Sequence, residues 1–298
     1  MKQLGFSIVI IIFLPVLVQG QAENPMPEIG LKLISGVNQG NSYITFPTDI
    51  GNVEPLWFEA NLIPNFYIRQ SKNSRLMGVL TPQIIIRMFQ EESFPVRTPS
   101  YMPQVTLYYL LYEKSNSRSF NLFGRAGHHS NGQEETFYLD DGSLNLKSGN
   151  FATNFLELGL IATNVNTRFN AYQFFKSSFE SHPDIFMQEE LRGIYSQYRW
   201  HNTFSIFKIP DENKKRKSQK PAISIKGETT WMFGDYRQLN SLSMKRLNLS
   251  LTFYYHPKFL EDIGLFVQYY HGADYYNIYF DHRLDVLRFG FMTEMLRF

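Results

Sequence analysis

The chain has 298 residues, a formal net charge of +2 and no cysteine. The near balance of charge argues against nucleic-acid binding as the main function, and the lack of cysteine excludes stabilisation by disulfides. Aromatic residues make up 16% of the sequence, with 27 Phe and 18 Tyr, whereas the hydrophobic fraction is only 43%. This combination favours a membrane β-barrel, in which lipid-facing residues alternate with polar lumen residues and aromatic girdles mark both interfaces.

The first segment in chain order is a predicted secretory signal peptide over residues 1–20. Its apolar run, LGFSIVIIIFLPVLV, follows a basic residue and ends shortly before a small residue, Gly20. The run is too short for a comfortable membrane-spanning helix and contains Pro15. We therefore expect an exported chain, with a retained N-terminal anchor as the alternative. Residues 21–41 then form a periplasmic N-terminal segment, and residues 42–298 form the barrel domain.

The mature sequence divides into segments of about ten residues, rich in Tyr, Phe, Ile, Leu and Thr, that are separated by polar clusters. No long window has a convincing 3.6-residue apolar period. The pattern predicts an all-β protein, an antiparallel transmembrane β-barrel of about 12 strands that ends at Phe298. The candidate strands are Ser42–Thr48, Leu56–Ile63, Tyr67–Ser71, Gly78–Met88, Gln104–Glu113, Phe120–Ser130, Thr153–Thr163, Arg168–Phe175, Ile194–Phe207, Ala222–Trp231, Ser243–Tyr255, Ile263–Tyr270 and Leu284–Phe298.

Two neighbouring candidate strands carry polar residues on their apolar faces. Residues two apart on a strand share a face, so His128 and Ser130 point the same way and His129 points the opposite way. In the next strand Asn154 shares a face with several leucines, and Glu157 lies on the other face. Polar groups on a lipid-facing surface are costly unless they lie near the interface or have a function. The cluster is therefore a candidate site, whereas a polar loop rim without chemistry is the alternative.

The motif GHHSNG, at residues 127–132, resembles the His-x-Ser-Asn-Gly motif of outer membrane phospholipase A, a family of twelve-stranded, calcium-dependent lipases of Gram-negative bacteria. Three further segments resemble the family in the same order: EESFPVRTPSYMPQVTLYY at 91–109, HPDI at 182–185, and VQYYHGADYYNIYFDHRLDVLRFGFM at 267–292. The resemblance implies an outer-membrane phospholipase that hydrolyses acyl esters of membrane phospholipids. It also implies a homodimer as the active form.

Carried over by position, the resemblance makes His128 the general base and Ser130 the nucleophile. Asn154 then orients the imidazole, as an aspartate does in serine proteases, with Asn150 as the fallback for this role. Positions two apart on a strand are about 6.6 Å apart at Cα, so the Ser130 and His128 side chains can lean together. His129 is expected to be a satisfied lumen residue.

The resemblance further implies that Ca²⁺ lies beside the nucleophile and supports the oxyanion through bound water. Ser93 matches one family ligand. Gln133 stands where the family has Arg, although that ligand is a backbone carbonyl. Asn150 stands where the family has a loop serine. The loop between the motif and Asn154 is also longer than in the family.

Three alternatives to the phospholipase stay open at this point. The first is a catalytically decayed barrel that serves as a structural or pore protein. The second is a lipid A deacylase, which also uses a His-x-Ser pair on a barrel exterior, although its barrel has about eight strands and the mature 278 residues suit twelve better. The third is a soluble secreted lipase, which usually carries a Gly-x-Ser-x-Gly motif; this sequence has none.

Overall fold

A computed structural model describes residues 29–293, apart from residues 48, 70, 72, 94, 115–116, 210–220, 258 and 261. The predicted signal peptide and the predicted strand end at Phe298 lie outside the described residues. None of the described helices is long and apolar enough to cross a membrane.

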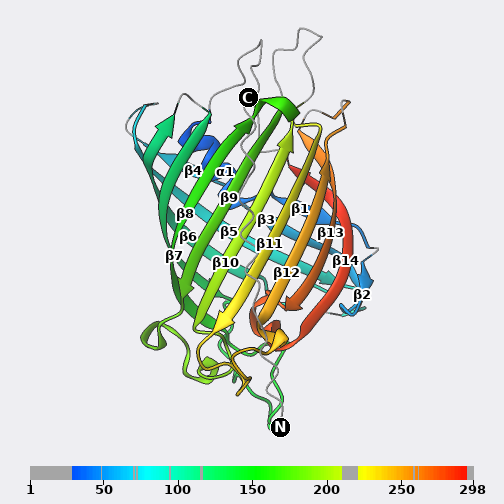
Figure 1. The fold of residues 1–298 in the computed structure, drawn as a ribbon. Helices are drawn as coiled ribbons and strands as arrows, with labels where there is room; N and C mark the ends of the chain where they lie inside the picture. The colour runs from blue at the N-terminus through cyan, green and yellow to red at the C-terminus, as the bar shows by residue number, and fades with distance from the viewer. Residues whose placement is uncertain are drawn as a thin grey trace, which may run out of the picture.

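The described chain forms a closed antiparallel barrel of twelve strands with two additional short strands (Figure 1). Each barrel strand pairs with its sequence neighbour, and β1 pairs with β14 to close the sheet. The predicted fold class is therefore confirmed. The barrel strands are β1 (Tyr43–Thr45), β3 (Leu56–Leu62), β5 (Leu76–Phe89), β6 (Ser100–Lys114), β7 (Arg118–Ser130), β8 (Ala152–Asn166), β9 (Ala171–Ser181), β10 (Tyr198–Lys208), β11 (Ile223–Phe233), β12 (Leu247–Tyr255), β13 (Ile263–Ala273) and β14 (Arg283–Thr293).

The alternation of apolar and polar residues places them on opposite faces of the barrel wall. In β8, the Leu156 and Leu158 side chains are 53% and 61% exposed on the outer face. Glu157, between them, is 3% exposed in the lumen. Its carboxylate accepts a hydrogen bond from Arg125 on the neighbouring strand at 2.9 Å. This period of two is the physical reason why a sequence of moderate hydrophobicity forms an apolar outer surface.

The two additional strands lie off the ring of twelve. The short strand β4 (Phe66–Ile68) pairs with β5 and continues the line of β3 after an interruption at Pro64, which has no N–H to donate to the ladder. The other, β2 (Ile50–Gly51), pairs with β14. The predicted strand boundaries differ most at β9, which begins and ends later than predicted, and at β10, because residues 194–197 belong to a loop.

One helix, α1 (Leu31–Gln39), lies inside the barrel at the end opposite the long loops (Figure 1). The sequence pattern predicts no helix here, because nine residues are too few to establish a clear helical period. Gln39 Nε2 donates a hydrogen bond to Thr106 Oγ1 at 3.0 Å, and Gln39 Oε1 accepts one from the Arg125 guanidinium at 3.2 Å. Ile34 is buried among lumen-facing residues of the barrel wall. Part of the predicted N-terminal segment is therefore packed within the barrel.

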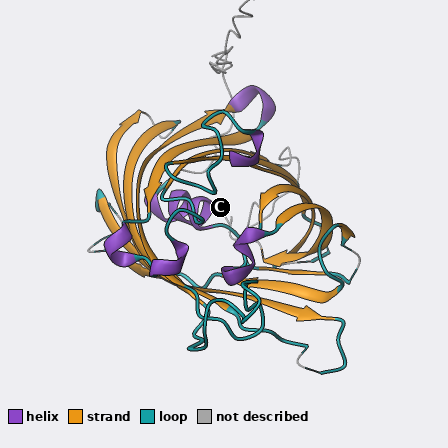
Figure 2. Cartoon of the chain, turned by 90° about the horizontal axis from the view of Figure 1, so that it is seen from below, coloured by secondary structure: helices purple, strands orange, loops and turns teal. Residues whose placement is uncertain are grey.

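Long loops and short 3₁₀ helices lie across the other end of the barrel (Figure 2). Their side chains form a hydrophobic cluster with the ends of β3 and β5. A bidentate ion pair joins this layer to the wall, because Arg87 of β5 contacts Asp274, just after β13, at 2.7 and 2.9 Å. The cluster consists of Leu56, Ile85, Phe89, Phe137, Phe151, Met187, Leu191, Tyr195, Tyr276, Ile278, Tyr279 and Phe280.

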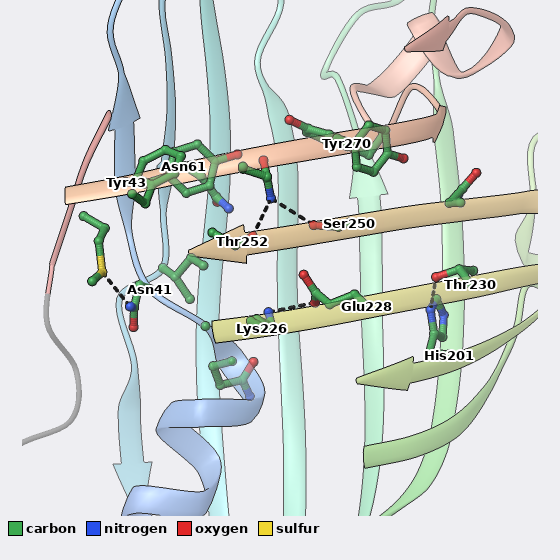
Figure 3. A pocket seen from close by; sticks show the side chains of 18 of the residues that line it. Asn41, Tyr43, Asn61, His201, Lys226, Glu228, Thr230, Ser250, Thr252 and Tyr270 are labelled. Atoms are coloured by element: carbon green, nitrogen blue, oxygen red, sulfur yellow. Dashed lines mark hydrogen bonds and ion pairs between the residues drawn. The ribbon is translucent and has the colours of Figure 1, made fainter. Parts of the chain in front are cut away.

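Between α1 and the loop layer, the lumen contains a polar cavity of about 360 Å³ (Figure 3). Side chains across the cavity wall pair with one another. Lys226 and Glu228 form an ion pair at 2.7 Å, and His201 is hydrogen-bonded to Thr230 at 2.8 Å. Several of the polar groups that line the cavity therefore already pair with one another.

Candidate active site

The candidate residues lie at the end of the barrel that carries the long loops. Ser130 is the last residue of β7, and the chain then enters the loop that leads to β8. In the β7–β8 ladder His128 lies directly opposite Asn154, and Ser130 lies opposite Ala152. Asn154 is exposed and His128 is partly buried. The structure thus places these side chains on the face of the wall that carries Leu156, as the strand parity predicts.

His128 and Asn154 are joined by a hydrogen bond between Nδ1 and Oδ1 at 2.9 Å. The Asn154 amide also donates from Nδ2 to the backbone carbonyl of Phe186 at 2.9 Å. Phe186 belongs to η2 (Asp184–Phe186), in the loop between β9 and β10. Three segments therefore meet at this point on the outer surface.

Ser130 lies beside this pair without a direct bond to it. Within the described chain, no hydrogen bond joins Ser130 to His128, so the expected contact is not formed. The physical reason is that side chains two apart on an extended strand start about 6.6 Å apart and must rotate toward each other. In free enzymes such contacts are often long and shorten only when the substrate is bound.

The turn after Ser130 is held from both sides by Asn131. Its Nδ2 donates to the Gly149 carbonyl at 2.8 Å, and its Oδ1 accepts from the Phe151 amide at 3.0 Å. Gly132 has φ +68°, a conformation that favours glycine. In the part of the chain that the structure describes, the Gly132 amide donates to no other residue. The long loop is thus fastened next to Ser130, with one free backbone N–H close to it.

His129 points into the barrel, as the parity predicts. It is 7% exposed, and its ring lies edge-on against Phe151 at a centroid distance of 4.8 Å. Its Nε2 atom, however, has no hydrogen-bond partner among the described residues. The expectation of a satisfied lumen histidine is therefore not met at this atom, and the ring packs against Phe151 instead.

An apolar surface groove of about 500 Å³ adjoins His128 and Asn154 on the outer face. Its walls come from β5, β6, β7 and β8 and from the turn that contains Phe186. Phe186 is 52% exposed at its edge. The lining residues are Leu80, Pro103, Gln104, Val105, Ala126, Gly127, His128, Asn154, Phe155, Leu156, Pro183 and Phe186.

A buried histidine lies on the inner side of the wall, behind Asn154. His182, just after β9, is hydrogen-bonded through Nδ1 to Thr153 at 3.1 Å and through Nε2 to Glu180 at 2.8 Å. Burial lowers the pKa of His182 below 6.5, and the nearby Arg199 guanidinium lowers it further, whereas Glu180 opposes the shift. This residue opens the segment HPDI, whose contact with β8 the sequence does not reveal.

The described structure shows no metal site at Ser93, Gln133 and Asn150, the residues expected to bind calcium, and their role stays a prediction. The Asn150 oxygen Oδ1 accepts a hydrogen bond from Gln188 Nε2 at 2.6 Å, so a donor already occupies it. Ser93 lies exposed in another loop, and Gln133 follows the turn at Gly132. No carboxylate belongs to the set, and the described residues contain no group of three or more His, Asp or Glu that could hold a metal ion. Calcium binds six to eight oxygens, which come from carboxylates, backbone or amide carbonyls and water.

No family model and no curated protein matches this chain. Solved structures do match. Outer membrane phospholipase A from Escherichia coli is 12% identical, with a TM-score of 0.56, over 86% of this chain and 93% of that one. A calcium-bound dimer of the Salmonella typhi outer membrane phospholipase is 13% identical, with a TM-score of 0.56, over 93% of this chain and 96% of that one.

The chain has the fold of outer membrane phospholipase A. An active-site mutant of the Escherichia coli enzyme, solved at pH 6.1, agrees with this, with a TM-score of 0.57 over 93% of this chain and 95% of that one at 12% identity. At identities this low, the structural matches show the fold of the barrel alone. The sequence pattern predicts the strands of the site and their facing, but it does not predict the contact with the Phe186 carbonyl, because any residue type can supply a backbone acceptor.

Proposed function

We propose that this chain is an outer-membrane phospholipase that hydrolyses acyl esters of membrane phospholipids, with Ser130 as nucleophile, His128 as general base and Asn154 as the group that orients the imidazole. The observation that carries the proposal is the hydrogen bond from His128 to Asn154 on the outer face of the barrel, beside an outward-facing serine. Such a constellation is useful only toward a substrate that is already in the membrane.

The proposed chemistry follows from the three side chains. Ser130 Oγ attacks the ester carbonyl carbon while its proton moves to His128 Nε2, and the carbonyl π electrons move to the oxygen. When the tetrahedral intermediate collapses, the C–O bond to glycerol breaks and the imidazolium gives its proton to the leaving alkoxide. Water then hydrolyses the acyl-serine in the same way, which releases a fatty acid and restores the Ser130 hydroxyl.

The oxyanion needs a donor that is already in place before the reaction. The Gly132 amide is suited to this role, since it lies two residues after Ser130 and donates to no other described residue. Calcium assistance, which the family resemblance implies, enters no step here.

The outer face supports a lipid substrate. The groove beside His128 is lined mainly by apolar side chains and is open along the wall, so it suits an acyl chain better than a polar solute. The proposed location is the outer membrane of a Gram-negative bacterium, which agrees with the fold. A homodimer belongs to the proposal because one similar structure is a dimer and because a second barrel could cover the outward-facing site.

The observations favour neither alternative barrel function. A pore requires an open lumen, whereas α1 and the loop layer occupy the two ends of this one (Figures 1 and 2). The twelve-stranded barrel is larger than the eight strands expected of a lipid A deacylase. A catalytically decayed barrel would differ from the enzyme in releasing no fatty acid from phospholipid.

The deciding experiment is release of fatty acid from phospholipid in mixed micelles by the refolded protein and its Ser130→Ala variant. Ser177→Ala is the matched control, because Ser177 bonds to Trp200 on the outer surface of β9, away from the site. We expect hydrolysis by the native protein and the control, and none by Ser130→Ala with an intact barrel. Equal activity of Ser130→Ala would refute the assigned nucleophile, and no activity from folded native protein would identify a decayed homologue.

A further inference from the structure

Asn154 makes two hydrogen bonds of opposite polarity. Its Oδ1 faces His128 Nδ1 at 2.9 Å, and its Nδ2 faces the Phe186 carbonyl oxygen at 2.9 Å. A backbone carbonyl can only accept, so the atom that faces it must be the NH₂ group. The Phe186 carbonyl therefore fixes the orientation of the amide, with its oxygen toward the histidine.

That orientation determines which ring nitrogen of His128 carries the proton. Because the amide oxygen can only accept, Nδ1 must be the donor. The neutral ring is then unprotonated at Nε2, the nitrogen that has to take the Ser130 proton. If the amide were reversed, its NH₂ group would face Nδ1, the proton would move to Nε2, and the ring could not act as a base toward Ser130.

The Phe186 carbonyl is held in place by a segment that we name the strap, residues 183–188. It continues the sheet beyond the end of β9 by pairing with the start of β8. The Gln188 amide donates to the Ala152 carbonyl at 3.1 Å, and the Ala152 amide donates to Gln188 Oε1 at 3.1 Å. A β-bridge joins Met187 to Thr153, next to Asn154.

The strap is also fastened to the loop that follows it. Arg192 donates to the Asp184 carbonyl at 3.3 Å, and the Gln197 side chain donates to the Asp184 carboxylate. Within the strap, the Phe186 amide donates to the Pro183 carbonyl at 2.9 Å. The acceptor for Asn154 is thus part of a short, bonded turn.

We propose that the strap is a positioning element of the active site: its Phe186 carbonyl orients Asn154 and thereby selects the Nδ1–H tautomer of His128. This inference rests on the proposed function. It also explains why the third residue is an amide. An aspartate at position 154 would place one carboxylate oxygen against the Phe186 carbonyl oxygen, two acceptors at hydrogen-bond distance, and the strap would have to move away.

The test measures the tautomer separately from activity. The protein is refolded in detergent micelles with ¹⁵N-labelled histidine, and the His128 signals are assigned by their loss in His128→Gln. The strap is loosened in Asp184→Ala/Gln188→Ala. The matched control is Glu190→Ala, which removes an exposed side chain from the same loop. Heat-modifiable migration in gels verifies that each barrel is folded.

We expect the Nδ1–H tautomer in the native protein and in the control. In the strap variant, the tautomer signals should shift toward an average of the two forms, and kcat should fall about fivefold with KM little changed, the size expected for loss of one neutral hydrogen bond. Asn154→Asp should be less active than the native protein. A native tautomer in the strap variant, or native activity in Asn154→Asp, would overturn the positioning role.

The two proposals fail in different ways. If the tautomers behave as expected but no variant or native protein releases fatty acid, the positioning geometry holds and the phospholipase function is wrong. If the native protein hydrolyses phospholipid and the strap variant keeps both its tautomer and its kcat, the function holds and the strap has no positioning role.

Discussion

His128 on β7 and Asn154 on β8 lie directly opposite each other in the barrel wall, with Nδ1 and Oδ1 2.9 Å apart on the outer face. Side chains opposite each other in an antiparallel ladder are the nearest cross-strand neighbours. The contact therefore follows from the strand register, although 25 residues separate the two positions in the sequence. A shift of the register by one residue would move one of them into the lumen.

The two adjacent histidines should differ sharply in their effect on activity. His128→Ala should lower kcat/KM by about 10²–10⁴-fold, the usual contribution of a general base. His129→Ala should keep activity within a few-fold, because His129 is buried in the lumen beside Phe151. Hydrolysis of a chromogenic ester in micelles measures both. The opposite ranking would mean that the strand is shifted by one residue.

Asn154 and Asn150 can be separated in the same assay. Asn154→Ala removes a hydrogen bond that becomes charge-assisted when His128 is protonated, so kcat should fall by about 10–100-fold. Asn150→Ala removes only the contact with Gln188, and its kcat should stay close to the native value. If Asn150→Ala proved the more damaging change, Asn150 would be the third member of the site.

Calcium can be tested without assuming that it is required. Activity is measured in excess chelator and then across a calcium titration, for the native protein, Ser93→Ala and Asn150→Ala. Because the Asn150 oxygen is already occupied by the Gln188 amide, we expect Asn150→Ala to leave the calcium response unchanged. A tenfold or larger increase in the half-saturating calcium concentration would instead identify Asn150 as a ligand.

The ion pair between Arg87 and Asp274 should dominate the attachment of the loop layer. Both side chains are about 2% exposed, and loss of the Asp274 charge leaves Arg87 with the Glu59 carboxylate alone, which also pairs with Arg288. Removal of one partner of a buried pair costs about 3–5 kcal/mol. Asp274→Asn should therefore lower the free energy of unfolding in guanidinium by about this amount. Glu91→Gln, which breaks the partly exposed contact with Arg97, should cost at most about 1 kcal/mol.

Acid should destabilise the chain through His182. Burial lowers its pKa in the folded state below 6.5, so the unfolded chain binds the proton more readily. The resulting stability is complete above the unfolded pKa and decreases as the pH falls through 6.5 toward the folded value. Thermal unfolding in detergent between pH 7.5 and 5 should show this decrease, and His182→Gln should reduce it. An identical pH dependence in His182→Gln would remove His182 as the cause.

The barrel of about twelve strands and the facing of the site residues can be predicted from the sequence, because a period of two is a local property. On any strand, Leu156 and Leu158 lie on one face and Glu157 lies on the other. The same parity placed His128 outward and His129 inward. Elements that depend on local composition, such as the break at Pro64, follow the sequence equally well.

The contacts of these residues, in contrast, depend on how distant segments pack together. The occupation of the Asn150 oxygen by Gln188 and the contact of Asn154 with the Phe186 carbonyl both come from a loop more than 30 residues away. The position of α1 in the lumen likewise depends on hydrogen bonds to side chains of β6 and β7. Backbone acceptors and cross-chain packing leave no local pattern, since their partners are chosen by register and barrel closure.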